Sequence, residues 1–171
     1  MEDIATHVGM SKRTVYARYA DKSALFKAAI HRAIQRYTVP RATIDALATN
    51  DLEATLTAVA RLRIANLSTP VATKLQRILN AQSYRFPELF NASFEEGTSP
   101  TIHFLCDLFT HATARGELNL PEPRRAAAAF LSLVVGGPAR IILSGQALDE
   151  QEIATRIRFA VRLFLDGARP R

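Results

Sequence analysis

The sequence has few of the features that mark secreted, membrane-bound or disulfide-stabilised proteins. It has a single cysteine, Cys106, so no disulfide can form within one chain, and no oxidising compartment is indicated. It opens with acidic Glu2 and Asp3 instead of the basic and apolar segments of a signal peptide. The longest apolar run, 126–137, is bounded by arginines and is shorter than the roughly 20 residues that a bilayer requires. We therefore expect a cytoplasmic protein that does not engage a membrane.

Catalytic motifs are also absent. The sequence contains no His-Glu-x-x-His pair, no Gly-x-Ser-x-Gly turn and no glycine-rich phosphate loop. The sustained alternation of apolar and polar residues that is typical of β-strands is missing as well. The sequence thus predicts an all-α protein that is not an enzyme and has no cofactor or metal.

Positive charge, by contrast, is concentrated at the N-terminal end. The chain has 171 residues and a net charge of +6, and residues 1–41 hold eight Lys and Arg side chains against three acidic ones. This segment carries +5, whereas the other 130 residues carry only +1. Such an asymmetry favours a nucleic-acid-binding head on a nearly neutral body. We assign the head to 1–41 and a ligand-binding and dimerisation body to 42–171.

Turn and cap residues predict three helices in the head. Gly9 suits the tight turn between the first two helices, and Ser11 and Asp21 suit the N-caps of the second and third. Residues 41–50 lack an apolar stripe and resemble a connection. The expected helices of the head are 1–8, 11–19 and 22–37.

The body is predicted to be a series of helices separated by proline and glycine. One helix carries a stripe at Leu52, Leu56, Val59 and Arg63. The later boundaries are marked by short motifs. We expect helix starts at Pro70, Pro87, Ser99-Pro100, Arg124 and Asp149, stops at Gly97, Gly116 and Gly167, and a break or kink at Gly136-Gly137-Pro138.

Residues 1–19 fit a helix-turn-helix. Ile4, Val8, Met10 and Val15 supply the apolar contacts that fix the crossing of two short helices. The outward side chains of the second helix can then enter the major groove of DNA, with basic groups on bases and hydroxyls on phosphates. The predicted DNA-binding residues are Ser11, Lys12, Arg13, Thr14, Tyr16, Ala17, Arg18 and Lys22.

The motifs at 1–5, 9–19, 21–22 and 25–26 resemble the DNA-binding signature of the TetR family, in which Gly-apolar-Ser-x-x-Thr-apolar-Tyr is followed by a lysine that begins the next helix. Segments of the body resemble the C-terminal domain of AefR-like members. The resemblance implies a helical, dimeric repressor that a ligand releases from DNA. Members of the family begin with a further helix of about four turns, so we expect the native chain to extend upstream of Met1.

A protein that reads a palindromic operator needs two heads, and hence an apolar dimer surface. Two stripes on the helices near the C-terminus suit a four-helix interface, although the same stripes could face the core of the monomer. The predicted interface residues are Ala126, Ala129, Phe130, Leu133, Ile153, Ile157, Ala160 and Phe164.

Phenylalanines cluster in the middle of the body and could line a cavity for a small apolar or amphipathic ligand, although core packing is the alternative for each of them. His103, Asp107 and His111 share a helix face, which could orient a polar ligand; a metal site is a weaker interpretation. The predicted pocket residues are Leu75, Leu79, Phe86, Phe90, Phe94, Phe104, His103 and Asp107.

Together these patterns predict a sequence-specific DNA-binding transcriptional regulator, acting as a homodimeric repressor on a double-stranded operator. A helical enzyme is the rival from another class, but it lacks a recognisable catalytic constellation. A helical ligand-binding protein whose incomplete head no longer reads DNA is the second alternative.

Overall fold

The computed structural model describes residues 6–7, 9 and 11–170, and within them every regular element is a helix, without a β-strand. Of the predicted first helix, 1–8, the structure describes only residues 6–7, which are helical. The predicted head-core residues Ile4, Val8 and Met10 lie outside the described residues, as does the side chain of Lys12. The helices in chain order are α2 (Lys12–Arg18), α3 (Lys22–Tyr37), α4 (Arg41–Asp45), α5 (Leu52–Ser68), α6 (Pro70–Gln82), α7 (Pro87–Ser93), the π-helical turn η1 (Phe94–Thr98), α8 (Ser99–Ala114), α9 (Pro123–Ser144) and α10 (Glu150–Ala168).

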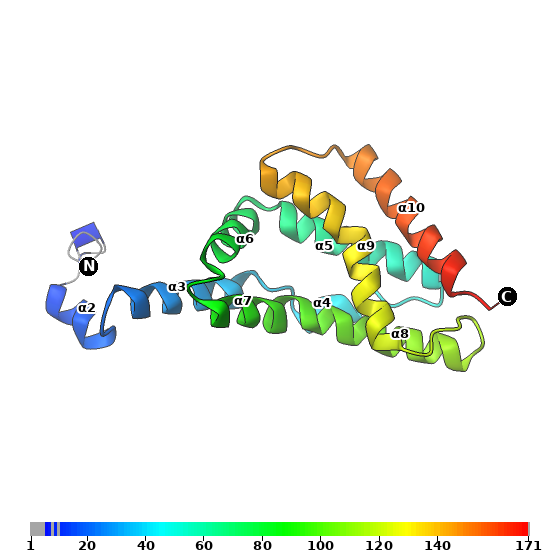
Figure 1. The fold of residues 1–171 in the computed structure, drawn as a ribbon, viewed down its shortest axis with the longest axis horizontal. Coiled ribbons are helices and arrows are strands. Elements are labelled where there is room, and N and C mark those ends of the chain that lie inside the picture. Colours follow the sequence, from blue (N-terminus) through cyan, green and yellow to red (C-terminus); the bar gives the residue numbers. More distant parts are fainter. Residues whose placement is uncertain (1–5, 8, 10, 171) are drawn as a thin grey trace.

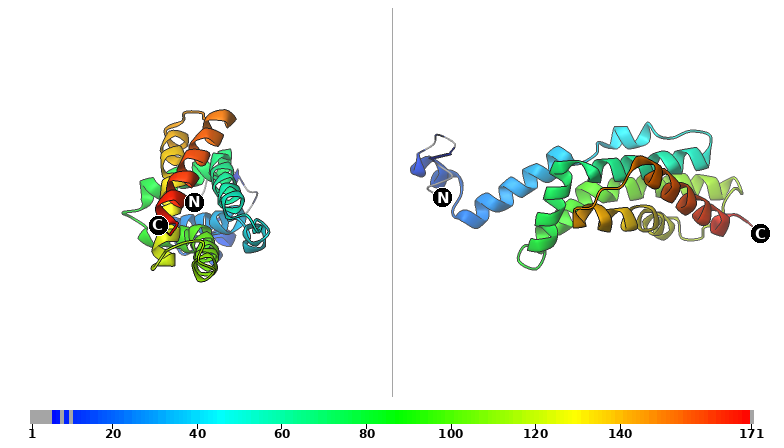
Figure 2. Two further views of the ribbon diagram at one scale, coloured as in Figure 1. Left: turned by 90° about the vertical axis from the view of Figure 1, so that its right-hand side faces the viewer. Right: turned by 90° about the horizontal axis from the view of Figure 1, so that it is seen from above.

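The molecule is elongated, with α2 at one end and the C-terminus at the other (Figure 1). Helix α3 leads from α2 back to the body and ends among α6, α7 and α4. Helices α5, α8, α9 and α10 form the thick part of the body, as the view from above also shows (Figure 2). The head therefore connects to the body through one long helix.

Side-chain caps fix where five of the described helices begin, and the sequence predicted four of these starts, at Ser11, Asp21, Pro70 and Asp149. Asp21 Oδ1 accepts from the Ala24 amide at 2.7 Å, and Asp149 Oδ1 accepts from the Glu152 amide at 2.7 Å. Thr69 caps α6, which has Pro70 at its first position. These oxygens satisfy amides that have no partner inside the helix. Gly116 follows α8 with a φ of 74°, as its predicted role as a stop requires.

The main core lies between α5, α8, α9 and α10. Its centre is a group of three aromatic rings from three helices, in which Phe109 lies 5.2 Å from Phe164 and 6.3 Å from Phe130 between ring centroids. Phe109 and Phe130 are fully buried. Leu56 and Ile64 of α5 complete the same cluster. This core makes the body a rigid support for the rest of the molecule.

The predicted break at Gly97 and Ser99-Pro100 is wrong. Helix α7, η1 and α8 form one continuous run, in which the Ser99 amide donates to the carbonyl of Phe94, five residues earlier. Pro100 has no amide hydrogen, and the wider π-helical turn before it lets the helix continue without that bond. Glycine and proline often end a helix, but here Gly97 and Pro100 are accommodated by a local change from α-helical to π-helical winding.

Of the break or kink predicted at Gly136-Gly137-Pro138, the structure shows the kink, because helix α9 continues through this segment (Figure 1). Pro138 lies inside α9 and is buried, and the helix changes direction along its length (Figure 1). A proline removes one internal hydrogen bond, which bends a helix without ending it when tertiary contacts hold both halves. Helix α9 is also long and apolar enough to cross a membrane by length and composition alone. It packs against α5, α8 and α10, and 28% of its most apolar stretch is buried inside the chain; a single helix of this kind is weak evidence of a membrane span.

Candidate nucleic-acid interface and ligand cavity

Helix α2 presents a polar face to solvent and anchors itself by one apolar residue. Val15 is buried, whereas Arg13, Thr14, Tyr16, Ala17 and Arg18 are exposed. The Ser11 hydroxyl caps the helix by accepting from the Thr14 amide at 3.1 Å. The five exposed residues therefore share the outer surface of a short, capped helix.

Ser11 and Thr14 also bond to each other. Their hydroxyl oxygens lie 2.7 Å apart, and either can donate. Both hydroxyls are thus partly engaged within the helix end, and Ser11 has a clear structural role as the cap. The guanidinium groups of Arg13 and Arg18 are in no ion pair among the salt bridges of residues 11–170.

Lys22 begins α3 directly after its Asp21 cap and is exposed. Lys22 is thus the first residue of a helix, where amide groups and the helix dipole already favour an anion. Lys22 and the exposed face of α2 are separated by the short link at residues 19–21. The basic groups predicted to contact DNA thus belong to two successive helix starts.

Helix α3 is fixed to the body by an apolar cluster, called here the α3 docking cluster. It consists of Ile30 and Ile34 of α3 with Leu79, Phe86 and Leu89, and all five are buried. The Phe26 ring packs on Phe86 with centroids 5.3 Å apart. Two polar contacts flank the cluster. Lys27 Nζ lies 2.7 Å from Glu88 Oε1, and His31 Nδ1 lies 3.6 Å from Glu96 Oε1.

The Lys27–Glu88 contact also affects the acid. The hydrogen bond from Lys27 lowers the pKa of the Glu88 carboxyl from its ordinary value, with a smaller contribution from the charge of Lys27. Both side chains are about half exposed. The pair therefore helps to orient α3 on α7 more than it stabilises the fold.

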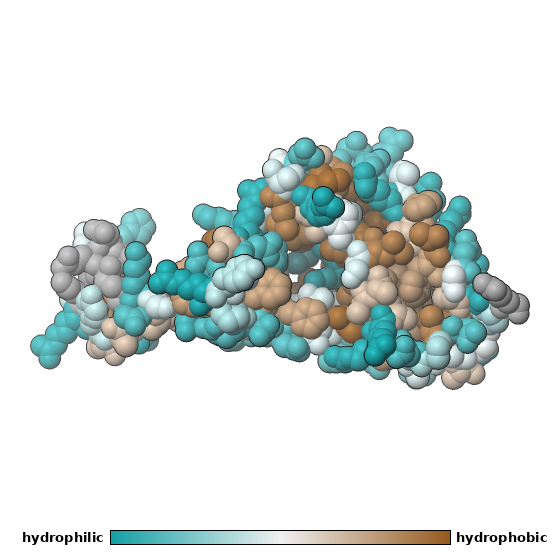
Figure 3. Space-filling view, in the orientation of Figure 1, coloured by the Kyte–Doolittle hydropathy of each residue, from teal (hydrophilic) through white to brown (hydrophobic). Residues whose placement is uncertain are grey.

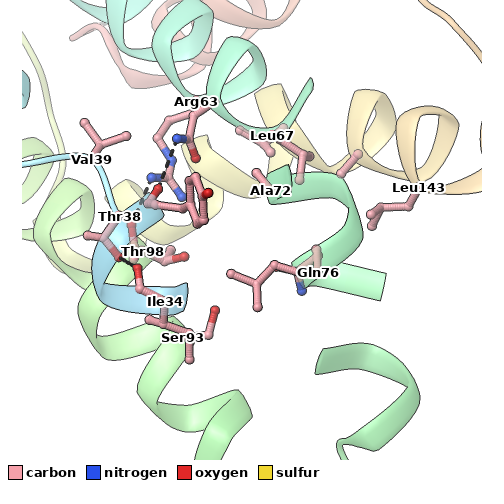
Figure 4. A pocket seen from close by; sticks show the side chains of 16 residues that line it. Ile34, Thr38, Val39, Arg63, Leu67, Ala72, Gln76, Ser93, Thr98 and Leu143 are labelled. Carbon is pink, nitrogen blue, oxygen red and sulfur yellow. Dashed lines mark hydrogen bonds between the residues drawn. The ribbon is translucent and has the colours of Figure 1, made fainter. Parts of the chain in front are cut away.

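A cavity of about 260 Å³ opens where α3 ends on the body. Its walls come from the last turn of α3 and the start of the next segment, from α5 and α6, from the α7–η1 junction and from α9 (Figure 4). The lining residues are Ile34, Tyr37, Thr38, Val39, Arg63, Asn66, Leu67, Ala72, Leu75, Gln76, Ser93, Gly97, Thr98, Val135, Ala139 and Leu143.

Of the predicted pocket residues, only Leu75 lines this cavity. Leu79 and Phe86 belong to the α3 docking cluster, and Phe104 is buried in the main core. Phe90 and Phe94 are 42% and 44% exposed on the outside of the body. These phenylalanines are close together in the sequence, but they do not surround one cavity, because the helices turn their side chains in different directions.

His103 and Asp107 are exposed on α8 and do not line the cavity either. Asp107 Oδ2 lies 3.7 Å from Arg41 Nη2, and this ion pair ties α4 to α8. Within the described part of the chain, no group of three or more His, Cys, Asp or Glu side chains could hold a metal ion.

The predicted dimer surface is divided between the core and solvent. Phe130, Ile157 and Ala160 are buried in the main core of a single chain, so these three residues cannot form the predicted surface between two copies. Ala126, Ile153 and Phe164 are partly buried against the same core, because the apolar stripes of α9 and α10 face α5 and α8. Ala129 and Leu133 are exposed.

Two exposed residues of α10 were missed by the sequence interpretation. Phe159 is 69% exposed and Leu163 is 52% exposed, and on α9 Leu133 is 41% exposed. Hydrophobic residues gather on the visible surface over α9 and α10 (Figure 3). Phe159 and Leu163 are one turn apart and off the stripe that faces the core, which is the sequence signal that could have identified them.

The described fold is therefore an all-helical regulator architecture: a small basic head with a capped, exposed helix, joined by one long helix to a body with a cavity. Residues 54–167 match the C-terminal domain of AefR-like transcriptional repressors, and residues 1–29 match the bacterial regulatory proteins of the tetR family. The chain belongs to the TetR family, and it is a DNA-binding transcriptional regulator and not an enzyme.

Solved structures agree with this assignment. A TetR-family transcriptional regulator from Mesorhizobium loti is 25% identical, with a TM-score of 0.80 over 99% of this chain and 86% of its own. The flavonoid-responsive regulator FrrA is 31% identical, with a TM-score of 0.76 over 100% of this chain and 87% of its own. A TetR regulator from Agrobacterium tumefaciens, 21% identical, shares the fold with a TM-score of 0.72 over 96% of this chain and 80% of its own. No curated protein matches the chain significantly.

Proposed function

We propose that the chain is a cytoplasmic, homodimeric repressor that a small ligand releases from a palindromic operator. One observation carries this proposal: α3 begins at the head with exposed Lys22 and ends in the cavity wall with Ile34, Tyr37 and Thr38. A ligand that fills the cavity touches α3, the helix that carries Lys22 and directly follows α2 with its DNA-reading face. Ligand binding and DNA binding are then linked through one rigid element.

The proposed release works through the position of α3. The two heads of a dimer must match half-sites roughly 34–36 Å apart, or a multiple of that spacing. A ligand that displaces the end of α3 tilts the helix on the α3 docking cluster and moves α2, because the far end of a lever moves most. The ligand must bind the displaced state more tightly for this to happen.

The proposed dimer joins α9 and α10 of two copies into a four-helix arrangement. Leu133, Phe159 and Leu163 are the exposed apolar residues of these helices, and large exposed apolar patches mark interaction surfaces. Of the residues first assigned to the interface, Ala129 and Leu133 remain in this proposal. The other copy would cover Phe159, which is more exposed than Leu133 or Leu163.

The proposed DNA contacts are the exposed residues of α2 and Lys22. Arg13 and Lys12 donate to guanine, while Thr14, Tyr16 and Lys22 contact phosphates, and Ala17 and Arg18 lie at the edge of the groove. Ser11 supports them by capping α2. The relative FrrA is flavonoid-responsive, which supports an aromatic effector for the present chain.

A titration of labelled duplexes from the DNA next to the chain's own gene, at several salt concentrations, tests the proposal. A repressor gives a steep log–log dependence of affinity on salt and prefers one sequence by at least about 1,000-fold. Weak binding that is equal for all sequences would favour the alternative of a ligand-binding protein that no longer reads DNA.

A further inference from the structure

The cavity has an uneven distribution of charge. Arg63 is the one charged side chain among its lining residues, and no acid lines it. Polar groups come from α3, α5, α6 and the α7–η1 junction. Aliphatic side chains of α5, α6 and α9, namely Leu67, Leu75, Val135 and Leu143, supply an apolar wall. A ligand that fits this lining has an apolar body and one polar end.

Arg63 is part-buried and has no anionic partner among the described residues. Its Nη1 donates to the carbonyl of Gly97 at 2.9 Å, and it is in no ion pair among the salt bridges of the described residues. The Arg63 side chain is part-buried, and this burial lowers the pKa of its guanidinium from its usual value. A guanidinium has five N–H donors, so one carbonyl leaves most of them without a protein acceptor.

The apolar stripe of α5 explains how Arg63 comes to lie there. Leu56 and Val59 of the stripe are buried in the main core, and Arg63 continues the same face one turn further. Its side chain therefore points inward by helical geometry and not by the flexibility of a surface arginine. Asn66, three residues on, donates its Nδ2 to the carbonyl of Tyr37 at 3.3 Å and so ties α5 to the end of α3.

We propose that the effector is a small apolar monoacid, either a carboxylate or an ionised phenol, whose charged oxygen pairs with Arg63. This inference rests on the proposed function, in which the cavity holds the effector. The acid lies near Arg63 and Thr98, and the apolar body extends toward the side of Gln76 and Leu143, across the cavity in the close-up (Figure 4).

The volume limits the body of the ligand. An apolar cavity of about 150 Å³ accepts benzene. The present cavity of about 260 Å³ thus suits one or two fused rings with a single acidic substituent. A planar guanidinium matches a carboxylate through two parallel hydrogen bonds, and pairing with an anion is stronger than pairing with a neutral oxygen.

Matched probes test the charge preference in the whole chain. Calorimetry at neutral pH compares 2-naphthoate with neutral 2-naphthamide, which has the same shape. A second arm follows 4-nitrophenol across its ionisation near neutral pH. We expect at least one anion to bind about 10- to 100-fold more tightly than its neutral counterpart, as for hydrogen bonds to charged groups.

Two variants of α5 complete the experiment. Arg63→Met keeps the length of the side chain but removes the charge, and we expect it to abolish the preference for the anion. Arg61→Met removes the same charge from an exposed position on the same helix and should keep that preference. The arm that shows the preference identifies the acid as a carboxylate or a phenol.

Equal binding of charged and neutral probes, binding of neither probe pair, or a preference that survives in Arg63→Met would overturn the proposal. Thermal unfolding of both variants shows whether each is folded. The DNA titration described above is an independent measurement. If it fails while Arg63→Met still loses the preference, the repressor proposal falls and the assignment of Arg63 stands.

Discussion

Arg13 and Lys22 are both exposed and basic, but their positions on two different helices predict different roles in DNA binding. Arg13 lies in the first turn of α2, and Lys22 begins α3 after the Asp21 cap. A guanidinium in the groove reads guanine through two hydrogen bonds, whereas an ammonium at a helix start neutralises a phosphate. The first contact depends on sequence and the second does not.

We therefore expect Arg13→Ala to relax the preference of the protein for its operator. Lys22→Ala should weaken binding to all duplexes alike and flatten the log–log salt slope by about one unit. Fluorescence anisotropy with operator and scrambled duplexes measures both effects. Identical consequences of the two substitutions on every duplex would show that the roles are wrongly assigned.

The Lys27–Glu88 pair gives a prediction for pH. Its hydrogen bond lowers the pKa of the Glu88 carboxyl below the ordinary value of 4.5, so the contact is complete above that value and is lost as pH falls through the lowered pKa. Protection of α3 amides against hydrogen exchange, corrected for intrinsic rates, should fall in that acid range. Glu88→Gln should remove this part of the pH dependence.

The control for this prediction is Glu95→Gln. Glu95 is exposed and forms no ion pair among the salt bridges of the described chain, so its substitution should leave the acid-range behaviour of α3 unchanged. An α3 whose protection is the same at every pH in the native chain would contradict the prediction.

At the scale of elements, α3 and α6 hold the connection between head and cavity. Leu79 of α6 is 2% exposed in the α3 docking cluster and does not line the cavity. Leu79→Ala should lower the free energy of unfolding by roughly 2–4 kcal/mol, because it leaves a void between two helices. Chemical denaturation measures this loss.

The same substitution tests the transmission between the two sites. With its support loosened, α3 should respond less to the ligand, so Leu79→Ala should reduce ligand-dependent release of DNA while leaving ligand affinity within about threefold. Val71→Ala, at a 44% exposed position of α6, is the control and should change neither property. If the ligand still released Leu79→Ala completely from DNA, this result would count against transmission through α3.

Single cap residues were enough to predict four helix starts, because a cap is a local interaction between neighbours in sequence. Ser11, Asp21, Thr69 and Asp149 all accept from an amide three residues later. The π-helical turn could not be predicted in this way. It depends on η1 packing against α3 as well as on the local sequence, so Gly97 and Pro100 gave a false break.

The cavity was missed for a related reason. Its walls come from segments more than 100 residues apart, and the aromatic count of one segment does not report how they assemble. One signal was nevertheless present. Arg63 continues the apolar stripe of α5, and a cation on a core-facing stripe costs free energy unless a partner pairs with its charge. Such a residue is therefore a candidate for a functional site.

At the scale of the whole molecule, the exposed side of α9 and α10 is the surface that we expect a second copy to cover. Phe159→Glu places a charge there and should raise the dimer dissociation constant by about 100-fold or more, because a buried carboxylate without a partner is costly. Sedimentation velocity measures the change. Operator affinity should fall with it, since a monomer reaches only one half-site.

Tyr84→Glu is the matched control, because Tyr84 is also an exposed aromatic residue but lies between α6 and α7. It should leave assembly unchanged. A Phe159→Glu protein that sediments as the native one does would remove α10 from the interface.

The π-helical turn has a consequence for recombining relatives of this protein. It holds one residue more than α-helical winding needs, so α7 and α8 are out of phase by about 100° compared with an uninterrupted helix. A chimera joined within 94–98 that loses this residue would rotate Leu89 away from α3 while α8 stayed seated in the core. Crossover points therefore belong on either side of that segment, with its length preserved.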